Sequence, residues 1–288
     1  MMQRDSAWHE RMYNNRALVP DFADHFARWQ QDSARARADM RCVLDVPYGA
    51  GVNETLDIFP ARKPDAPVVV FIHGGYWRSL DKSDHSFVAE PLLQAGACVV
   101  VINYALCPGT AQAPVTVPSI ALQCAQALAW VWRHIGAYGG DRDRIRLMGH
   151  SAGGHLAAML LCCDWKQLGQ DLPARLTTRA LALSGVYELA PLRHAPFLQA
   201  DLRLTAQQAQ ACSPVLYAAP QGRRFQVLVG GNESFEFIRQ TQAIRQAWGE
   251  GVVDVCEALP GLNHFSILGQ VSEPGSRVRQ HAQALAAD

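Results

Sequence analysis

The sequence predicts an α/β fold with a mostly parallel central sheet, helices on both faces and a small cap. Three observations lead to this prediction. Short apolar strands alternate with helical segments along most of the 288 residues. The runs 68–72 and 97–102 are unbroken apolar stretches, which is typical of strands buried on both faces. A glycine-rich turn at 149–154 lies between a strand and a helix.

Length and composition indicate one domain over residues 1–288 that acts on a small molecule. Acidic and basic residues balance at 26 each, so we expect neither nucleic acid nor a membrane surface as partner. The first residues are polar, unlike a signal peptide, and no apolar run reaches membrane-spanning length. Eight scattered cysteines without a C-x-x-C pair predict reduced thiols in a cytoplasmic protein. A homodimer stays possible.

The elements follow from apolar periodicity and from the turns between them. Residues 1–40 are polar with scattered aromatic side chains, and we expect them to form a helical extension over the main domain. Segments 42–46 and 55–59 predict an antiparallel edge. Further strands are expected at 68–72, 97–102, 145–148, 179–184, 225–229 and 252–258. Helices are expected at 83–94, 119–135, 156–163, 235–248 and 273–287. The irregular, proline-containing segment 186–220 is interpreted as a cap-like insertion, with a weak helix near 206–212.

The turn at 149–153 reads Gly-His-Ser-Ala-Gly and fits the nucleophile-elbow pattern G-x-S-x-G. A chance Gly-Ser loop is the alternative, but the strand before it and the helix after it favour a true elbow. The neighbours of the serine must be small there, because a larger side chain would collide with the adjoining strand or helix. Ser151 is therefore the predicted nucleophile, placed at a helix N-terminus that favours developing negative charge.

A serine hydroxyl needs a base, usually a histidine held by a carboxylate. In the α/β-hydrolase fold the order along the chain is nucleophile, acid, histidine. His264 lies in the loop after the last predicted strand, where this fold presents its base. Its rivals are less well placed: His155 is one helical turn after Ser151, His194 is in the predicted cap and His281 is in the last helix.

The acid is expected after the preceding strand. Glu233 is the first carboxylate in the loop 230–234 and is the predicted acid. Glu236 belongs to the next helix and Asp254 to a predicted strand, so both are weaker candidates. The alternative role for Glu233 is to cap the helix that begins near residue 235.

The loop after strand 68–72 reads His-Gly-Gly-Tyr-Trp. Its glycines allow backbone amides to approach a substrate closely, so we expect Gly74 and Gly75, with Ala152, to form an oxyanion hole. His73 is expected to brace this loop. A metal cluster of His73, His150, His155 and His264 is the competing hypothesis. The sequence has no H-E-x-x-H and no zinc spacing, and no G-x-G-x-x-G follows a strand, so we expect hydrolysis without a metal or cofactor.

The elbow and the H-G-G loop together resemble the hormone-sensitive-lipase-like branch of the α/β-hydrolases. Five motifs from about residue 40 onward extend this to a resemblance with the kynurenine formamidase (arylformamidase) family: H-G-G-Y-W at 73–77, G-H-S-A-G-G-H at 149–155, L-S-G-V-Y at 183–187, N-E-S-F-E-F-I-R-Q at 232–240 and N-H-F at 263–265. The resemblance implies hydrolysis of N-formyl-L-kynurenine to formate and L-kynurenine through an acyl-enzyme. In that family the position of Glu233 is more usually aspartate, although both acids serve hydrolases.

On this reading, aromatic side chains near the mouth of the site stack on the substrate ring. Tyr76, Trp77 and Tyr187 are the expected substrate-binding residues, and Phe197 is a further candidate. The alternative function is a general carboxylesterase acting on short acyl esters with the same three catalytic residues. A non-catalytic hydrolase-fold binding protein ranks last, because such proteins usually lack part of the machinery.

Overall fold

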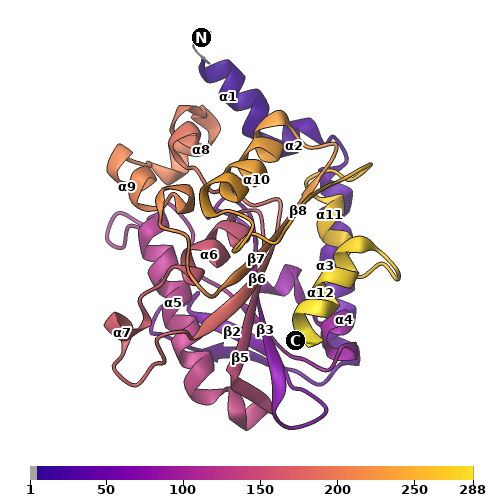
Figure 1. The fold of residues 1–288 in the computed structure, drawn as a ribbon. Coiled ribbons are helices and arrows are strands. Elements are labelled where there is room, and N and C mark those ends of the chain that lie inside the picture. Colours follow the sequence, from indigo (N-terminus) through magenta and orange to yellow (C-terminus); the bar gives the residue numbers. More distant parts are fainter. Residues whose placement is uncertain (1–4, 288) are drawn as a thin grey trace.

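The computed structural model of the protein describes residues 5–287. Its core is an eight-stranded sheet in the order β1-β2-β4-β3-β5-β6-β7-β8 (Figure 1). The strands are β1 (Val43–Pro47), β2 (Thr55–Phe59), β3 (Ala66–Ile72), β4 (Cys98–Ile102), β5 (Gly140–His150), β6 (Thr177–Leu183), β7 (Arg224–Gly230) and β8 (Val255–Leu259). β2 pairs antiparallel with both β1 and β4, and the other neighbours are parallel. The predicted mostly parallel sheet is confirmed.

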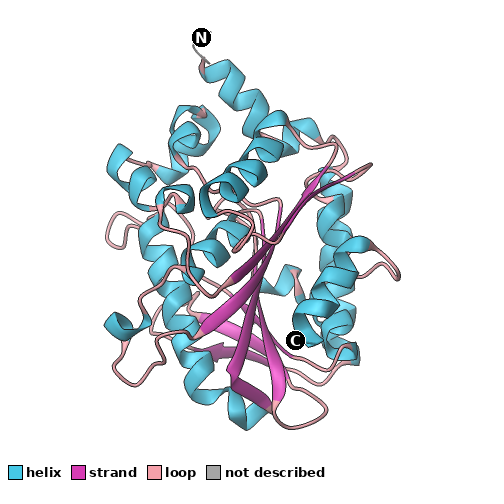
Figure 2. Ribbon diagram, in the orientation of Figure 1, coloured by secondary structure: helices cyan, strands magenta, loops and turns pink. Residues whose placement is uncertain are grey.

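Helices cover both faces of the sheet, as Figure 2 shows. One face carries α5 (Val117–His134) with its 3-10 continuation η3 (Ile135–Tyr138), α6 (Ala152–Leu161), α7 (Trp165–Leu168) and α10 (Phe235–Trp248). The other carries α3 (Phe22–Asp39), α4 (Ala89–Gln94), α11 (Ser266–Gly269) and α12 (Arg277–Ala287). Along β3, Val68, Val70 and Ile72 enter the first core, whereas Val69 and Phe71 enter the second. This alternation explains why the strand is apolar at every position.

The N-terminal segment and the cap segment meet above the sheet. The first contains α1 (Ser6–Tyr13) and α2 (Asn15–Leu18), and the second contains η4 (Ala190–His194), α8 (Pro196–Leu202), α9 (Ala206–Ala211) and η5 (Pro214–Leu216). The Tyr13 hydroxyl donates to Glu236 on α10 at 2.7 Å. The Glu10 carboxylate accepts from the Phe197 amide at 3.3 Å. α1 is therefore tied both to the main body and to the cap.

The helix expected over 83–94 is broken into pieces: the 3-10 turns η1 (Lys82–Asp84) and η2 (Ser86–Val88), followed by α4. Asp81 and Asp84 form a reciprocal capping box that starts a separate short turn. The Lys82 ammonium is drawn into an ion pair with buried Asp57 at 2.8 Å. These local interactions outweigh the apolar pattern that suggested one continuous helix.

Two element boundaries also differ from expectation. β8 begins at Val255 rather than at 252, because the amides of Val252 and Val253 both donate to the Gly249 carbonyl in a turn. The closing helix begins at Arg277 rather than at 273, because Gly275 has a φ of 77°, which no α-helix accommodates. Both differences reflect turns that periodicity alone does not locate.

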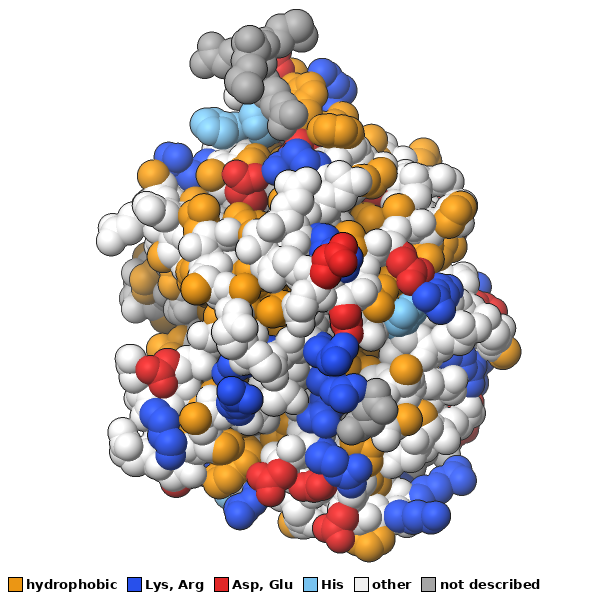
Figure 3. All heavy atoms as spheres, viewed as in Figure 1, with side chains coloured by type: hydrophobic (Ala, Val, Ile, Leu, Met, Phe, Trp, Pro, Cys, Tyr) orange, Lys and Arg blue, Asp and Glu red, His pale blue; other side chains and the backbone are white. Residues whose placement is uncertain are grey.

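Charged side chains of both signs are spread over the face drawn in Figure 3. Within residues 5–287, every helix is too short or too polar to cross a lipid bilayer.

Candidate active site

Ser151 occupies a sharp turn between β5 and α6. Its φ of 55° and ψ of −117° lie outside the regions preferred by non-glycine residues, a strain of about 1–3 kcal/mol. A Cβ on Gly149 would lie 2.2 Å from the Gly153 carbonyl oxygen, and a Cβ on Gly153 would lie 1.9 Å from that of Ile72. Only glycine fits at these two positions, so close packing of the backbone fixes the turn that presents Ser151.

His264 lies in the loop after β8 and contacts the serine. Its Nε2 is 3.0 Å from Ser151 Oγ, and its Nδ1 is 2.7 Å from Glu233 Oε2. Because a carboxylate only accepts, Nδ1 carries the proton and Nε2 can accept from the serine hydroxyl. The imidazole packs against Phe237 and Phe265, with ring centroids 4.6 and 5.3 Å away. Apolar packing and the Glu233 bond therefore fix both the orientation and the tautomer of the ring.

The carboxylate of Glu233 is fully buried and divides its partners between its two oxygens. Oε2 faces His264, while Oε1 accepts from the Gly230 amide at 2.7 Å and from the Ser184 hydroxyl. Glu233 thus supports the imidazole rather than the N-terminus of α10, where Ser234 occupies the N-cap position. Sequence reasoning missed Ser184, because one serine after β6 carries no pattern that assigns it to Glu233.

The two other candidate acids are engaged elsewhere. Glu236 is buried on α10, where it pairs with Arg239 at 2.9 Å and accepts from the Tyr13 hydroxyl. Asp254 lies just before β8 and pairs with Arg224 at 3.0 Å. Glu233 is the one of the three that binds His264.

The rival histidines also face other partners. His155 is buried on α6 and its Nε2 lies 2.7 Å from the Cys212 carbonyl oxygen. Burial lowers the pKa of His155 to about 4, so the ring is neutral. His281 on α12 lies 3.0 Å from Gln226 Oε1, and His194 is exposed in η4. His264 is the histidine that the fold brings to Ser151.

His150, which precedes the serine, holds the loop that carries His264. Its Nε2 donates to the His264 carbonyl at 2.8 Å. Burial, and then the neighbouring His264, lower the pKa of His150 well below its usual range, so the ring is neutral. The four histidines of the competing metal hypothesis therefore face separate partners. In the part of the chain that the structure describes, no three His, Cys, Asp or Glu side chains gather as metal ligands would.

The loop at 73–77 is held in place by residues that follow β4. His73 Nε2 lies 3.1 Å from Asn103 Oδ1, and its ring stacks on Tyr104 with centroids 4.2 Å apart. The Tyr104 hydroxyl donates to the His73 carbonyl at 2.8 Å. Burial lowers the pKa of His73 to about 4, which makes it a neutral structural group.

The same loop lies directly against the elbow. A Cβ on Gly74 would lie only 3.1 Å from Ser151 Cβ, and Gly75 has a φ of 97° that favours glycine. The amides of Gly74, Gly75 and Ala152 donate to no protein acceptor among residues 5–287. Backbone N–H groups without protein acceptors therefore lie next to the serine, as an oxyanion hole requires.

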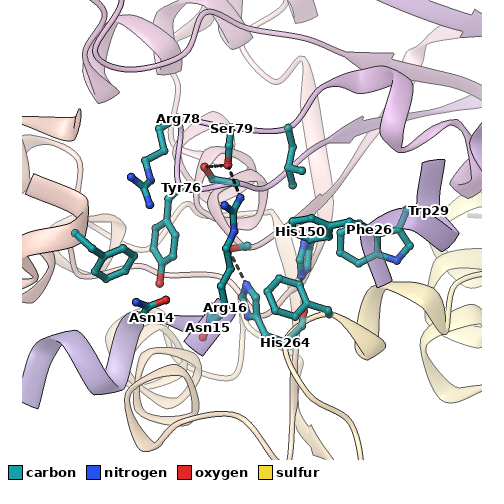
Figure 4. Close-up of a pocket in the computed structure, with 15 residues that line it drawn as sticks. Asn14, Asn15, Arg16, Phe26, Trp29, Tyr76, Arg78, Ser79, His150 and His264 are labelled. Atoms are coloured by element: carbon teal, nitrogen blue, oxygen red, sulfur yellow. Dashed lines mark hydrogen bonds between the residues drawn. The ribbon is translucent and has the colours of Figure 1, made fainter. Parts of the chain in front are cut away.

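A pocket lies over Ser151 and His264, as Figure 4 shows. Part of its wall comes from the first forty residues, which contribute Asn14, Asn15, Arg16, Phe26 and Trp29, and the cap contributes Phe197. Sequence reasoning assigned no site residue to this N-terminal segment. Its polar composition predicts helices but gives no sign of where they pack.

Two of the aromatic residues expected at the mouth line this pocket. The Tyr76 hydroxyl donates to the Tyr13 carbonyl at 2.7 Å, which fixes the ring beside the N-terminal helices. Phe197 meets Tyr76 edge to face, with centroids 5.9 Å apart. Together the two rings form an apolar side of the pocket.

Trp77 and Tyr187 do not line the pocket, and this corrects the sequence-based expectation. Both side chains are fully buried. Trp77 packs edge to face on His155 at 4.9 Å, and Tyr187 packs the same way on Phe225 at 5.7 Å. Burying a large aromatic ring lowers the free energy of the folded protein. Both rings therefore pack in the apolar core instead of lining the pocket.

Several known proteins are similar to this chain in sequence and fold. A model of the family described as BD-FAE matches residues 56–247. The kynurenine formamidase of Danio rerio is 32% identical, over 86% of this chain and 83% of that protein. Esterase LipQ of Mycobacterium tuberculosis is 29% identical, over 76% of this chain and 56% of that protein. A candidate thioesterase of Silicibacter sp. tm1040 has a crystal structure that covers 100% of both chains with a TM-score of 0.81 at 28% identity.

Proposed function

The chain belongs to the BD-FAE family, and from that premise we propose that it cleaves an aryl formamide, N-formyl-L-kynurenine, to formate and L-kynurenine. It is a hydrolase of the serine hydrolase type, as its formamidase and esterase relatives are. The similarity to kynurenine formamidases extends over most of both chains, which favours an amide substrate. The pocket adds an apolar side, formed by Tyr76 and Phe197, that suits an aromatic leaving group.

One observation carries the proposal. Ser151, His264 and Glu233 come from three separate loops and form a hydrogen-bonded series, with distances of 3.0 Å and 2.7 Å between successive atoms. In this arrangement the imidazole can remove the serine proton while the buried carboxylate stabilises the resulting imidazolium. We assign Ser151 as nucleophile, His264 as general base and acid, and Glu233 as the acid that orients it.

The first half of the reaction forms a formyl-enzyme. Ser151 Oγ bonds to the formyl carbon as His264 Nε2 takes its proton, and the carbonyl oxygen becomes an oxyanion. The amides of Gly74, Gly75 and Ala152 donate to that oxyanion. The C–N bond then breaks as His264 returns the proton to the aniline nitrogen, because an unprotonated amine leaves poorly.

The second half releases formate. A water molecule gives its proton to His264 and its oxygen attacks the formyl carbon of the ester. The same amides stabilise the second oxyanion. When it collapses, Ser151 recovers its proton from His264, and formic acid departs and gives its remaining proton to the solvent to become formate. No redox partner is consumed, so the chain's own residues complete the cycle.

A general carboxylesterase is the second candidate, and the similarity to esterase LipQ favours it. The two functions are separated by kcat/KM on N-formylkynurenine and on short-chain p-nitrophenyl esters. The proposal requires the formamide to be a good substrate in its own right. If it is turned over no faster than background while esters react well, the esterase reading replaces it. Labelling of Ser151 by a fluorophosphonate tests the nucleophile independently of either substrate.

We also propose that the enzyme works in a reducing compartment, the cytoplasm. All eight cysteines are free thiols in the structure. Burial raises the pKa of Cys98 to about 12, so this thiol stays protonated and unreactive.

A further inference from the structure

The pocket contains a cation without a carboxylate partner. Arg16, on α2, lines the pocket, and its Nη2 donates to the Ser79 hydroxyl at 3.2 Å. The guanidinium also lies over the rings of Phe22 and Phe26, with its carbon 5.7 and 5.4 Å from their centroids. No carboxylate within residues 5–287 forms an ion pair with it. Arg16 therefore keeps several N–H donors and a full positive charge for another group.

A second arginine strengthens the positive field at this position. Arg78 lines the same pocket, where it binds Asp201 and lies over Phe197 at 5.5 Å. Burial, and then the charge of Arg78, lower the pKa of Arg16, although a guanidinium stays protonated. Asp201 balances only one of the two cations. An anion would offset the remaining charge.

Asn15 provides an independent observation. Its side chain lines the pocket and is only 5% exposed, and its Nδ2 has no hydrogen-bond partner. A buried amide donor without an acceptor is unfavourable, and native structures rarely leave one in place without a reason. Asn15 and Arg16 are adjacent in sequence, and both side chains line the pocket, so the N-terminal segment supplies it with two donor groups that have unused N–H bonds.

These donors belong to the pocket of the reactive serine. Figure 4 shows Arg16 extended across the pocket between Tyr76 and His150, with its guanidinium at Ser79. The Ser79 hydroxyl in turn donates to the Gly75 carbonyl at 3.1 Å. A group bound to Arg16 would thus be connected, through Ser79, to the loop proposed to hold the oxyanion.

We propose that Arg16 and Asn15 bind a carboxylate on the leaving group of the substrate. The inference rests on the proposed function, and it identifies the preferred substrates as arylformamides that carry a carboxylate beyond the ring. A carboxylate has acceptor sites for both the guanidinium and the amide, and it neutralises the excess charge. The aromatic ring of such a substrate then lies along Tyr76 and Phe197, between the carboxylate and the formyl group.

The test compares a formamide whose ring carries a side chain ending in a carboxylate with one whose ring carries no side chain. N-formylkynurenine is the first and formanilide is the second. The measurement is the ratio of kcat/KM for the first to kcat/KM for the second. Arg16→Gln should lower this ratio by about tenfold to a hundredfold, mainly through KM, because it removes a charged hydrogen bond. Arg16→Lys should recover part of the loss, and Asn15→Ala should lower the ratio by a smaller factor. Arg11→Gln, at an exposed arginine on α1 outside the pocket, is the matched control.

Equal losses on both formamides, or an unchanged ratio in Arg16→Gln, would overturn the inference. Fluorophosphonate labelling of Ser151 in each variant shows that the protein is folded and its nucleophile intact. If the wild-type enzyme hydrolyses no formamide, the proposed function fails on its own. The anion site is then tested with 3-(2-acetoxyphenyl)propanoate against phenyl acetate, which place the same carboxylate difference on an ester. A ratio that falls in Arg16→Gln supports the site, and one that does not fall refutes it.

Discussion

The hydroxyl of Ser184 donates to Oε1 of Glu233, which leaves Oε2 to the imidazole of His264. The Gly230 amide is the second donor to Oε1, at 2.7 Å. Two donors thereby hold Oε1 in place while Oε2 faces the imidazole. This support predicts that Ser184 affects the rate without contacting the substrate.

We expect Ser184→Ala to lower kcat about tenfold with little change in KM, because one hydrogen bond to a charged carboxylate is lost and Gly230 still holds Oε1. Steady-state kinetics on N-formylkynurenine checks this. Thr241→Val is the control, since the Thr241 hydroxyl is buried on α10 and donates to Phe237 rather than to Glu233. A kcat in Ser184→Ala equal to that of wild type would show that Gly230 alone is sufficient.

Substitution of the acid should separate rate from stability. Glu233→Gln should lower kcat about a thousandfold, because the amide no longer stabilises the imidazolium. Glu236→Gln should leave kcat near wild type but lower the free energy of unfolding by about 2 kcal/mol, since Arg239 loses a charged partner and keeps only Glu188. Kinetics and urea denaturation of both variants test the assignment. If Glu236→Gln loses the rate instead, Glu233 is not the acid.

Ser151→Ala and His264→Ala should each lower kcat by about ten-thousandfold or more, because neither partner acts without the other. Circular dichroism should show an unchanged fold, since each substitution only removes side-chain atoms. His194→Ala, at an exposed histidine of the cap, should retain activity. Substantial turnover by either of the first two variants means that the nucleophile or the base has been misassigned.

Two glycines in helices should respond in opposite directions to alanine. At Gly153 a new Cβ would lie 1.9 Å from the Ile72 carbonyl oxygen, so Gly153→Ala should lower the free energy of unfolding by about 3 kcal/mol. At Gly269 on α11 nothing lies within 4 Å, so Gly269→Ala should raise it by about 0.5 kcal/mol. Urea denaturation measures both. If the two substitutions changed the free energy of unfolding equally, the backbone at the elbow could move to accept a Cβ at residue 153.

His155 links stability to pH. Burial lowers its pKa to about 4, whereas the unfolded chain titrates near 6.5. The unfolded state therefore binds more protons between these values, and stability falls as the pH falls through 6.5 toward 4. At pH 5 the titration of His155 alone should lower the free energy of unfolding by about 2 kcal/mol relative to neutral pH. His155→Gln, which keeps a donor for the Cys212 carbonyl, should flatten the dependence of the free energy of unfolding on pH between pH 5 and 8. An unchanged slope would assign the dependence to other histidines.

The sequence located the groups whose positions follow from strand ends. Ser151, Glu233 and His264 each lie in the connection that follows a strand of a mostly parallel sheet, and the ends of such strands meet at one edge. The small residues around Ser151 added a steric signature that few other turns share. For these residues, order along the chain was enough to predict which side chains would meet.

Other parts of the site depend on packing that has no local signature. Arg16 and Asn15 reach the pocket because α1 is anchored to α10 through Tyr13 and Glu236, a contact between residues more than two hundred positions apart. Trp77 lies only one residue beyond Tyr76, yet it enters the core while Tyr76 lines the pocket. The direction of a single side chain in a loop depends on backbone angles that a motif does not encode.

The contribution of Asn14, Asn15, Arg16, Phe26 and Trp29 to the pocket wall bears on how the protein can be shortened. A version trimmed to the family-matched region, residues 56–247, would lack both this wall and His264. Trimming only the first forty residues would keep Ser151, Glu233 and His264, but it would remove this wall together with α3, whose Trp29 is buried in the second core. Such a fragment should therefore be less stable than the parent, and it would lack the side chains that sort acyl compounds by shape or charge on that side of the pocket.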